Sequence, residues 1–363
     1  MRSYETTETA ETMILREADV TCTPVMGVIE LLPLCNMNCR MCYVHLSKAE
    51  MDAQGRMLTC EEWLSIVKAA CEEGLLFLTL TGGEVLLYPE LKRLYTEISQ
   101  MGVVLEVKTN GTLLDEELAD FFSENGVQRI YITLYGKDNA TYAALCGNAD
   151  GFTQVMRAAG LLKEREIPFV FDCSLTPDNI DQLPELYQIA EAFDVPLSVA
   201  TYMFPGLRRG ITSQEQYRLA AEQAAEAEVS GCQPVTSPQT ARETLAKLKN
   251  GPKLKGRTGF PCRAGRSVFN MNWRGELLPC GMFLEPRISL LEHSFRECWD
   301  FMVDACQKTP QCQDCIACDL QNLCQVCPAV CMTETGSTAG RPEYICRMTE
   351  HKVRELRKIA VKE

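Results

Sequence analysis

The chain has 363 residues, of which 46% are hydrophobic and 23% charged, so it can bury the core of two ordinary domains or of one large domain with an appendage. Its 23 glycines and 17 prolines are too few for a disordered or collagen-like chain, and its longest uncharged apolar stretch, around residues 74–83, is too short to cross a bilayer. A net charge of −13 argues against binding to nucleic acid or to an anionic membrane, and an acidic N-terminus without an apolar signal segment predicts a cytoplasmic protein.

Between residues 25 and 203, six short apolar runs alternate with amphipathic stretches. The runs predict strands at Val28–Leu32, Leu76–Leu80, Val103–Lys108, Arg129–Leu134, Phe169–Leu175 and Leu197–Tyr202. The stretches predict helices at Glu61–Glu73, Glu90–Met101, Asp115–Asn125, Phe152–Glu164 and Asp181–Phe193, the first opened by a capping box of Thr59 and Glu62. Strands that alternate with helices form right-handed parallel crossovers, so we predict an α/β fold with a partial (β/α)6 parallel barrel and its chemistry at the C-terminal strand ends.

The pattern changes after residue 210. A helix rich in Ala and Glu is predicted at Gln214–Val229, and residues 242–274 carry nine Lys and Arg against a single acidic residue. The predicted division is an N-terminal extension at 1–24, the barrel at 25–210, a helical and basic linker at 211–255, a small cysteine-rich domain at 256–346 and a C-terminal helix at 347–363.

Twenty cysteines are distributed unevenly along the chain, and eleven of them lie between Cys262 and Cys346. This density is below that of a disulfide-stapled secreted scaffold, and a cytosolic protein keeps its thiols reduced. Because the chain has only three histidines, thiolates must dominate any metal site. The cysteines therefore indicate iron–sulfur clusters or zinc.

The first group of cysteines is Cys35, Cys39 and Cys42, in the loop that follows the first predicted strand. Three closely spaced thiolates can hold three corners of a cubane and leave the fourth iron open to a small molecule. The alternatives are structural cysteines or a zinc knuckle, for which only Cys22 and His45 lie near enough in sequence to supply a fourth ligand. The spacing and the position after a strand favour the cluster.

This Cys-x3-Cys-x2-Cys loop resembles the signature of the radical S-adenosylmethionine (radical SAM) superfamily, as does Thr81-Gly82-Gly83-Glu84 after the second strand. The resemblance implies a [4Fe-4S] cluster on the three cysteines and S-adenosylmethionine bound to its open iron. In that family the Gly-Gly-Glu segment lines the methionine end of the cofactor, and a hydroxyl after the fourth strand meets the ribose. The implied cofactor-binding residues are Met41, Tyr43, Gly82, Gly83, Glu84, Asn110 and Thr133. The chain departs from the family at Met41, where an aromatic residue is frequent, and at Cys146-Gly147, where many relatives have Arg-Gly.

The C-terminal cysteines resemble the SPASM domain, an extension of radical SAM enzymes that holds two auxiliary iron–sulfur clusters, [4Fe-4S] being the type expected. By position, Cys262 and Cys280 would ligate the first auxiliary cluster. The second would be held by Cys315, Cys318, Cys324 and Cys346.

Two departures leave the ligands of the first auxiliary cluster open. The usual Cys-x5-Cys-x3-Cys spacing places Pro328 where a ligand is expected, between Cys327 and Cys331, and no cysteine precedes Cys262 in residues 256–261. This cluster would then have three protein ligands and an open iron, or it would use both Cys327 and Cys331. A zinc ribbon that includes Cys312 is an alternative for this region. Packing is the expected role of the remaining cysteines: Cys60, Cys71, Cys146, Cys173, Cys232, Cys298 and Cys306.

The resemblance implies an enzyme that reductively cleaves S-adenosylmethionine to a 5′-deoxyadenosyl radical. Because SPASM-bearing relatives mostly act on peptides, we expect a ribosomally made precursor peptide to be cross-linked through a thioether or carbon–carbon bond, or epimerised. Sulfatase-type formylglycine formation is disfavoured, since Gly281-Met282 follow Cys280 where those relatives have Asp. A reaction on a small molecule or in cofactor biosynthesis is the alternative within the enzyme class, and an iron–sulfur electron carrier is the non-enzyme alternative.

The implied partners are the precursor peptide and a flavodoxin- or ferredoxin-type electron donor. Many relatives begin with a leader-binding domain of roughly 80 residues, longer than an ordinary loop extension. Only 34 residues precede Cys35, so we expect another surface or a separate leader-binding protein to recognise the leader.

Overall fold

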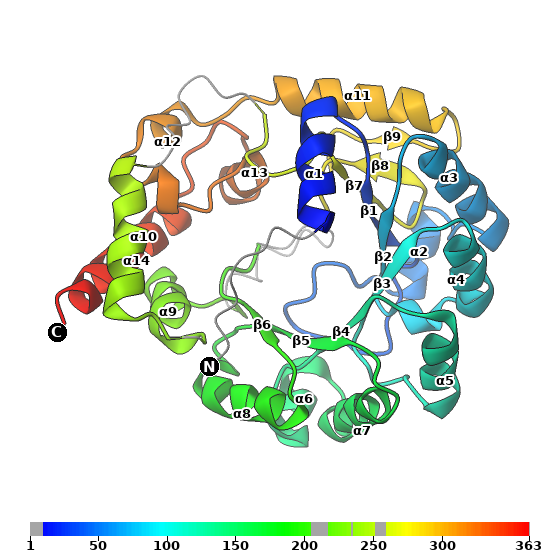
Figure 1. The fold of residues 1–363 in the computed structure, drawn as a ribbon, viewed down its shortest axis with the longest axis horizontal. Helices are drawn as coiled ribbons and strands as arrows, with labels where there is room; N and C mark the ends of the chain where they lie inside the picture. Colours follow the sequence, from blue (N-terminus) through cyan, green and yellow to red (C-terminus); the bar gives the residue numbers. More distant parts are fainter. Residues whose placement is uncertain (1–9, 205–216, 234, 251–258, 363) are drawn as a thin grey trace.

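The computed structural model describes residues 10–204, 217–233, 235–250 and 259–362. Six parallel strands form an open barrel in the order β6-β5-β4-β3-β2-β1 (Figure 1). They are β1 Met26–Glu30, β2 Phe77–Thr81, β3 Val104–Thr109, β4 Arg129–Thr133, β5 Phe169–Ser174 and β6 Leu197–Ala200. All six predicted strands are confirmed, with bounds shifted by a few residues at most.

Five helices that the sequence predicts line the outer face of the strands (Figure 1). They are α3 Cys60–Glu72, α4 Leu91–Gln100, α5 Glu116–Asn125, α7 Gly151–Glu164 and α8 Leu183–Phe193. The predicted capping box is present at the start of α3: the backbone N–H of Glu62 donates to the Thr59 hydroxyl, and the Glu62 carboxylate accepts the Thr59 N–H. These two bonds satisfy backbone groups that a helix leaves unpaired, so α3 begins at a defined residue.

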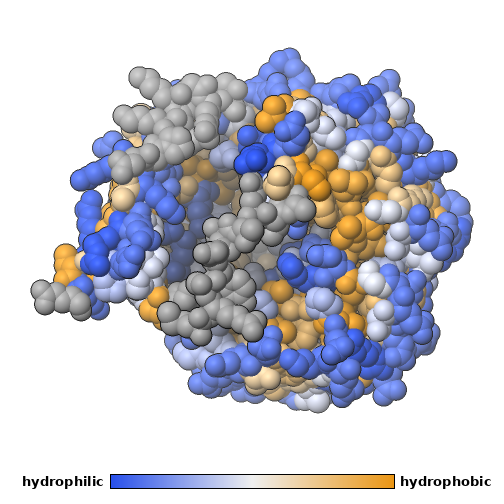
Figure 2. Space-filling view, in the orientation of Figure 1, coloured by the Kyte–Doolittle hydropathy of each residue, from blue (hydrophilic) through white to orange (hydrophobic). Residues whose placement is uncertain are grey.

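The two faces of each barrel strand differ in chemistry. On β3, Leu105 and Val107 are buried against the helices, whereas the alternate residues Glu106 and Lys108 are only partly covered. Because successive side chains of a strand point to opposite faces, the second set faces the inside of the barrel. Figure 2 shows this face of the molecule hollowed near its centre, with hydrophilic side chains in the hollow. The fold thus provides a polar chamber inside an apolar wall.

The sheet continues into the cysteine-rich region instead of ending with the barrel. Strand β7 (Val268–Met271) pairs in parallel with β1, and β8 (Glu276–Leu278) and β9 (Ile288–Ser289) extend the sheet antiparallel. One apolar core runs from Ile29 through the barrel to Met348. The predicted boundaries at 210/211 and 255/256 lie outside the described residues, and the first strand of the cysteine-rich region is built into the barrel sheet.

The C-terminal region consists mainly of helices around the cysteine loops. They are α9 Ala221–Glu226, α10 Pro238–Asn250, α11 Phe295–Lys308, α12 Gln313–Ala317, α13 Pro328–Thr335 and α14 Glu343–Ala360. The described part of the predicted helix at 214–229 is α9, followed by one π-helical turn at Ala227–Gly231. The terminal helix predicted at 347–363 begins four residues earlier, at Glu343, and is α14.

A nearly buried ion pair joins the barrel to this region. The Arg218 guanidinium lies 2.6 Å from the Glu334 carboxylate on α13, with side chains only 10% and 7% exposed. The Tyr202 hydroxyl, just beyond β6, donates to the same carboxylate at 2.7 Å, and Arg218 lies 4.1 Å from the centre of the Tyr344 ring on α14. Separating the two regions would leave a buried charge without its partner, which is strongly destabilising. This junction therefore holds the cysteine-rich region against the end of β6.

Three α-helices in residues 10–204 were not predicted: α1 Ala10–Thr21, α2 Lys48–Gln54 and α6 Asn139–Cys146. The first two are mostly exposed, and α6 has a weak apolar periodicity, so the usual sequence signal is faint. Contacts elsewhere in the chain stabilise them. The Asp19 carboxylate on α1 accepts bonds from Arg263 at 2.7 Å and Ser267 at 2.5 Å, which fastens α1 beside β7.

Candidate functional site

The three N-terminal cysteines lie together in the loop after β1, at the C-terminal end of the barrel. None of the three forms a disulfide, and all three are half-buried. The backbone N–H of Met37 donates to the Cys35 sulfur at 3.4 Å, and the N–H of His45 donates to the Cys42 sulfur at 3.3 Å. Backbone donors of this kind stabilise the thiolate relative to the thiol, and the thiolate is the form that binds metal.

The negative charges that gather in this loop favour the binding of a metal cation. The pKa of the Cys35 thiol is raised to about 12, first by burial and then by the charges of Glu84, Cys39 and Cys42, against the opposing hydrogen bond from Met37. Thiolates crowded in a half-buried loop repel one another, and bound iron removes that penalty because it favours the charged form of each ligand. The donor set and its position after β1 fit an iron–sulfur cluster with an open corner.

The segment Thr81–Glu84 packs against residues 32–34, which lead from β1 into the cysteine loop. The backbone N–H of Gly83 donates to the Leu32 carbonyl at 2.7 Å, and that of Glu84 donates to the Leu34 carbonyl at 2.8 Å. A Cβ atom at Gly83 would lie 2.3 Å from the Leu34 carbonyl oxygen. Glycine is therefore required here by the close approach of two backbones, one residue before Cys35.

The Glu84 carboxylate faces the polypeptide, not the chamber. It is 0% exposed and accepts hydrogen bonds from the Thr109 hydroxyl at 2.6 Å, the Asn110 N–H at 2.7 Å and the Leu86 N–H at 3.0 Å. Burial outweighs these three bonds and raises the pKa of the carboxyl. The carboxylate thus ties the end of β2 to the end of β3, and any contact of this segment with a ligand comes from the backbone.

Asn110 connects the end of β3 to the cysteine loop. Its side-chain N–H2 group donates to the Asn36 carbonyl oxygen at 2.9 Å and lies 3.6 Å from the Cys35 sulfur, while its own carbonyl oxygen accepts from Thr112 at 2.7 Å. A donor beside a cluster thiolate tunes the charge that the sulfur can carry. The sequence singled out Asn110 as a cofactor contact, and the structure places it against a cluster cysteine.

The remaining predicted cofactor residues surround the same strand ends. Thr133 ends β4, with its side chain on the chamber face, and its carbonyl accepts a bond from the Tyr142 hydroxyl at 3.1 Å. Met41 is buried in the core beneath the loop, whereas Tyr43 is partly exposed. Gly82 packs against the backbone of Leu32. Of these residues, Thr133 is on the chamber face and Met41 is part of the core.

Cys146 was expected only to pack, but it lies against the cluster loop. The last two carbonyls of α6, those of Leu145 and Cys146, accept the backbone N–H groups of Arg40 and Asn38 at 3.0 and 2.9 Å. The Cys146 thiol is fully buried and hydrogen-bonds the thiol of Cys39, which together with burial raises the pKa of Cys39. No periodicity signals such a contact, because it depends on where α6 ends relative to a distant loop.

Below the strand ends, a polar network crosses the chamber wall. The Lys108 ammonium lies 3.5 Å from the Asp172 carboxylate on β5 and 4.6 Å from the centre of the Tyr131 ring on β4. The Tyr131 hydroxyl and Thr79 both donate to Glu106 at 3.3 Å. These groups give the chamber both charges and several donors, and they suit a polar substrate such as a peptide segment.

The C-terminal thiols form two groups, and the cysteines of one group affect each other's pKa values. Cys262, Cys280 and Cys327 form the first group. Burial raises the pKa of Cys327 to about 11, and the charges of Cys280 and Cys262 add to that rise. Of the two cysteines that flank Pro328, the structure therefore brings Cys327 to the expected first-cluster ligands.

The second group contains Cys315, Cys324, Cys331 and Cys346. A hydrogen bond to Cys331 and burial raise the pKa of Cys315. Burial raises the pKa values of Cys324 and Cys346, and the charge of Cys315 contributes to both. Cys331 thus lies beside Cys315, and the spare Cys312 also hydrogen-bonds Cys315. Cys318, expected in this group, is exposed at the end of α12.

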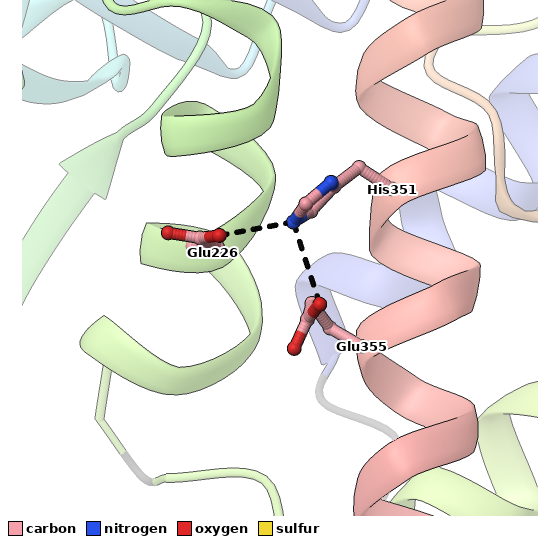
Figure 3. Close-up of side chains that lie close together, drawn as sticks. All are labelled: Glu226, His351 and Glu355. Atoms are coloured by element: carbon pink, nitrogen blue, oxygen red, sulfur yellow. Dashed lines mark hydrogen bonds and ion pairs between the residues drawn. The ribbon is translucent and has the colours of Figure 1, made fainter.

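Within the described ranges, one trio of side chains has the close spacing of a single-metal site: Glu226, His351 and Glu355 (Figure 3). His351 Nε2 lies 3.0 Å from Glu226 on α9 and 3.4 Å from Glu355 on its own helix, α14. Glu355 also pairs with Lys358 at 2.7 Å. This trio is an ion-pair contact between two helices. The cysteine groups are spaced more widely, as polynuclear clusters require when each thiolate binds a different iron.

Comparisons with known proteins agree with this site. Residues 29–190 match the Radical SAM superfamily. The chain is 25% identical over 268 residues to PqqA peptide cyclase of Granulibacter bethesdensis, covering 72% of this chain and 68% of that protein. It is 26% identical over 193 residues to AdoMet-dependent heme synthase of Nitratidesulfovibrio vulgaris, about half of each chain.

The fold is also that of Streptococcus suis SuiB bound to the precursor peptide SuiA, with a TM-score of 0.68 over 92% of this chain and 78% of that chain at 16% identity. Among the described residues, no helix is both long and apolar enough to span a membrane. The cysteine loop after β1 and the glycines packed against it lie within residues 29–190, the part of the chain that matches the Radical SAM superfamily.

Proposed function

We propose that this protein cleaves S-adenosylmethionine reductively and uses the resulting radical to modify a ribosomally made peptide, by a thioether or carbon–carbon cross-link or by epimerisation. The observation that carries the proposal is the three-thiol loop of Cys35, Cys39 and Cys42 at the mouth of a chamber with a polar wall. Supporting it, the chain is similar to a peptide cyclase over most of its length and has the fold of a protein bound to a precursor peptide.

Each part of the site has a role in this reaction. The three cysteines would hold a [4Fe-4S] cluster, which supplies the electron that cleaves S-adenosylmethionine to methionine and a 5′-deoxyadenosyl radical. The backbone of Gly82 and Gly83 would meet the methionine end of the cofactor and Thr133 its ribose. Asn110 would orient the Cys35 sulfur, at 3.6 Å from its amide. The Lys108–Asp172 pair would bind polar groups of the substrate below the reactive carbon.

Two auxiliary clusters complete the proposal. The first would use Cys262, Cys280 and Cys327, and the second would draw on Cys315, Cys318, Cys324, Cys331 and Cys346. The core that runs from the barrel into this region, and the Arg218–Glu334 junction, would hold these centres at a fixed distance from the chamber. A flavodoxin- or ferredoxin-type donor would supply electrons, and a separate protein would present the leader.

The test is anaerobic incubation of the reconstituted protein with S-adenosylmethionine and dithionite, with 5′-deoxyadenosine measured by chromatography. Wild type and a Cys71→Ala control, altered at a half-buried cysteine on α3, should form 5′-deoxyadenosine, and Cys39→Ala should form none. Cleavage by Cys39→Ala at the wild-type rate would refute the proposed site. With the cognate peptide, loss of two hydrogens would indicate a cross-link, and unchanged mass with deuterium uptake would indicate epimerisation.

Similarity to a heme synthase over 193 residues favours one second candidate, a reaction on a small molecule. The two candidates differ in what stimulates cleavage. A precursor peptide should increase the rate of 5′-deoxyadenosine formation, and lose two hydrogens or take up deuterium, in the first case only. Consumption of a porphyrin-type substrate, with no change to a peptide, would favour the reaction on a small molecule.

A further inference from the structure

Helix α11 (Phe295–Lys308) carries two buried cysteines, Cys298 and Cys306, which are 0% and 2% exposed. The sequence favoured packing for both, because they fall in one amphipathic pattern. Cys298 fits that expectation: its sulfur lies 3.5 Å from the carbonyl of Ser289, against the short strand β9. Cys306 lies two turns further along, at the end of the helix nearest the cysteine loops.

The Cys306 thiol is seated on the loop that follows Cys262. A Cβ atom at Gly265 would lie 2.6 Å from the Cys306 sulfur, and Gly265 has a φ of +65°. The loop is closed by the Arg263 carbonyl, which accepts the N–H groups of Arg266, Ser267 and Val268 at 3.0, 3.1 and 3.2 Å. A side chain at Gly265 would displace the thiol, so the bare backbone admits the sulfur into this tight loop.

The end of α11 packs against the segment that carries Cys262. A Cβ atom at Gly259 would lie 2.5 Å from the Cys306 carbonyl oxygen, so Cys306 contacts this segment on both sides of Cys262. Phe260 of the same segment packs on the ring of Phe283, whose backbone N–H donates to the Cys280 carbonyl at 3.0 Å. A thiol from a packed helix therefore lies beside the loops that carry Cys262 and Cys280.

We propose that Cys306 is the fourth protein thiolate of the first auxiliary cluster, with Cys262, Cys280 and Cys327. The assignment rests on the auxiliary clusters of the proposed function, and it supplies the ligand that is missing before Cys262. Four thiolates close a cubane, so this centre would have no open iron. It would then exchange electrons with the substrate without binding it. A ligand on a helix packed against the barrel sheet also holds the cluster more rigidly than a loop does.

The test counts metal in a background that lacks the N-terminal cluster, the full-length chain with Cys35, Cys39 and Cys42 all replaced by Ala. Anaerobic reconstitution with iron and sulfide should load this variant with both auxiliary clusters. Adding Cys306→Ala should remove roughly half of that iron, since one of two equal clusters is lost, or leave a cluster whose EPR spectrum changes on addition of 2-mercaptoethanol. Cys306→Ser should restore iron with a shifted EPR spectrum, because an oxygen ligand replaces sulfur.

Cys298→Ala in the same background is the matched control, since it removes a buried sulfur from the same helix. It should keep the iron content, the EPR spectrum and the insensitivity to added thiol of the background. Iron and EPR that are the same in the Cys306→Ala and Cys298→Ala variants would overturn the assignment. Circular dichroism and thermal unfolding of the apo-proteins establish that both fold. A background variant that binds no iron would refute the auxiliary clusters and this assignment together, while 5′-deoxyadenosine formation by wild type would still test the N-terminal site.

Discussion

Replacing Gly83 by Ala tests whether the glycine segment and the cysteine loop form one unit. The new Cβ atom would lie 2.3 Å from the Leu34 carbonyl oxygen, where ordinary contact begins at 3.4 Å, so the two backbones must separate by about 1 Å. That movement would break the bonds of 2.7 and 2.8 Å that Gly83 and Glu84 make to Leu32 and Leu34. At about 1 kcal/mol for each bond and 1–3 kcal/mol for overpacking, the free energy of unfolding should fall by about 3–5 kcal/mol.

The assay is urea unfolding of the reduced apo-protein, followed by circular dichroism, together with iron content and 5′-deoxyadenosine formation after reconstitution. The matched control is Gly160→Ala, in the middle of α7, where an added Cβ meets nothing within 4 Å. Alanine is favoured over glycine in a helix, so this control should be stabilised by about 0.5–1 kcal/mol.

A Gly83→Ala variant with the stability of wild type, normal iron content and normal cleavage would refute the reasoning. The segment would then be an ordinary turn that tolerates a side chain. Loss of cleavage with unchanged stability would also contradict the packing argument, because the calculated clash is with backbone atoms of Leu34 that are present without any cofactor.

Four further predictions concern the cluster loop and the barrel helix α3. Replacing all three cysteines of the N-terminal loop by Ala should abolish 5′-deoxyadenosine formation and leave roughly two thirds of the wild-type iron if three cubanes are present, by iron assay. Cys146→Ala should lower the reduction potential of the N-terminal cluster in an EPR-monitored titration, whereas the buried control Cys173→Ala should not. With Cys39 bound to iron as a thiolate, the Cys146 thiol beside it would donate a hydrogen bond to the sulfur and stabilise the more negative, reduced cluster. Thr59→Ala should cost about 1 kcal/mol of stability at neutral pH through loss of the cap. Because the pKa of Glu62 is lowered from 4.5 to about 2, the stabilisation that this carboxylate contributes should be present above pH 4.5 and vanish as the pH falls towards 2, as followed by urea unfolding of Glu62→Gln beside wild type.

The barrel could be predicted from the sequence because its signals are local. Each strand has an apolar run of the right length, and the capping box of Thr59 and Glu62 marks the start of α3. The cysteine loop could also be placed, since its position follows from the end of β1. Spacing along the chain was enough to identify these features.

The assignment of Cys327, Cys306 and Cys146 needed the tertiary structure. Cys327 and Cys331 are four residues apart on one segment, yet they lie with different groups of thiols. Cys306 and Cys298 fall in one amphipathic pattern in the sequence, but Cys306 lies against Gly265 and Cys298 against Ser289. Contacts between elements that are distant in sequence have no periodic signal, so the sequence pattern assigned Cys306 and Cys146 to packing and left Cys327 and Cys331 open as alternative ligands.

The pairing of β7 with β1 has a consequence for biosynthesis. Ile29 pairs with Met271, about 240 residues later, so one edge of β1 has no neighbour until most of the chain has left the ribosome. Long-range pairings of this kind form late and leave an unpaired strand edge exposed in the meantime. During translation, the nascent barrel would therefore expose an unpaired, aggregation-prone strand edge next to the cysteine loop. Cluster insertion and closure of the sheet would then be competing events, and a cell short of iron would accumulate chains that are prone to aggregate.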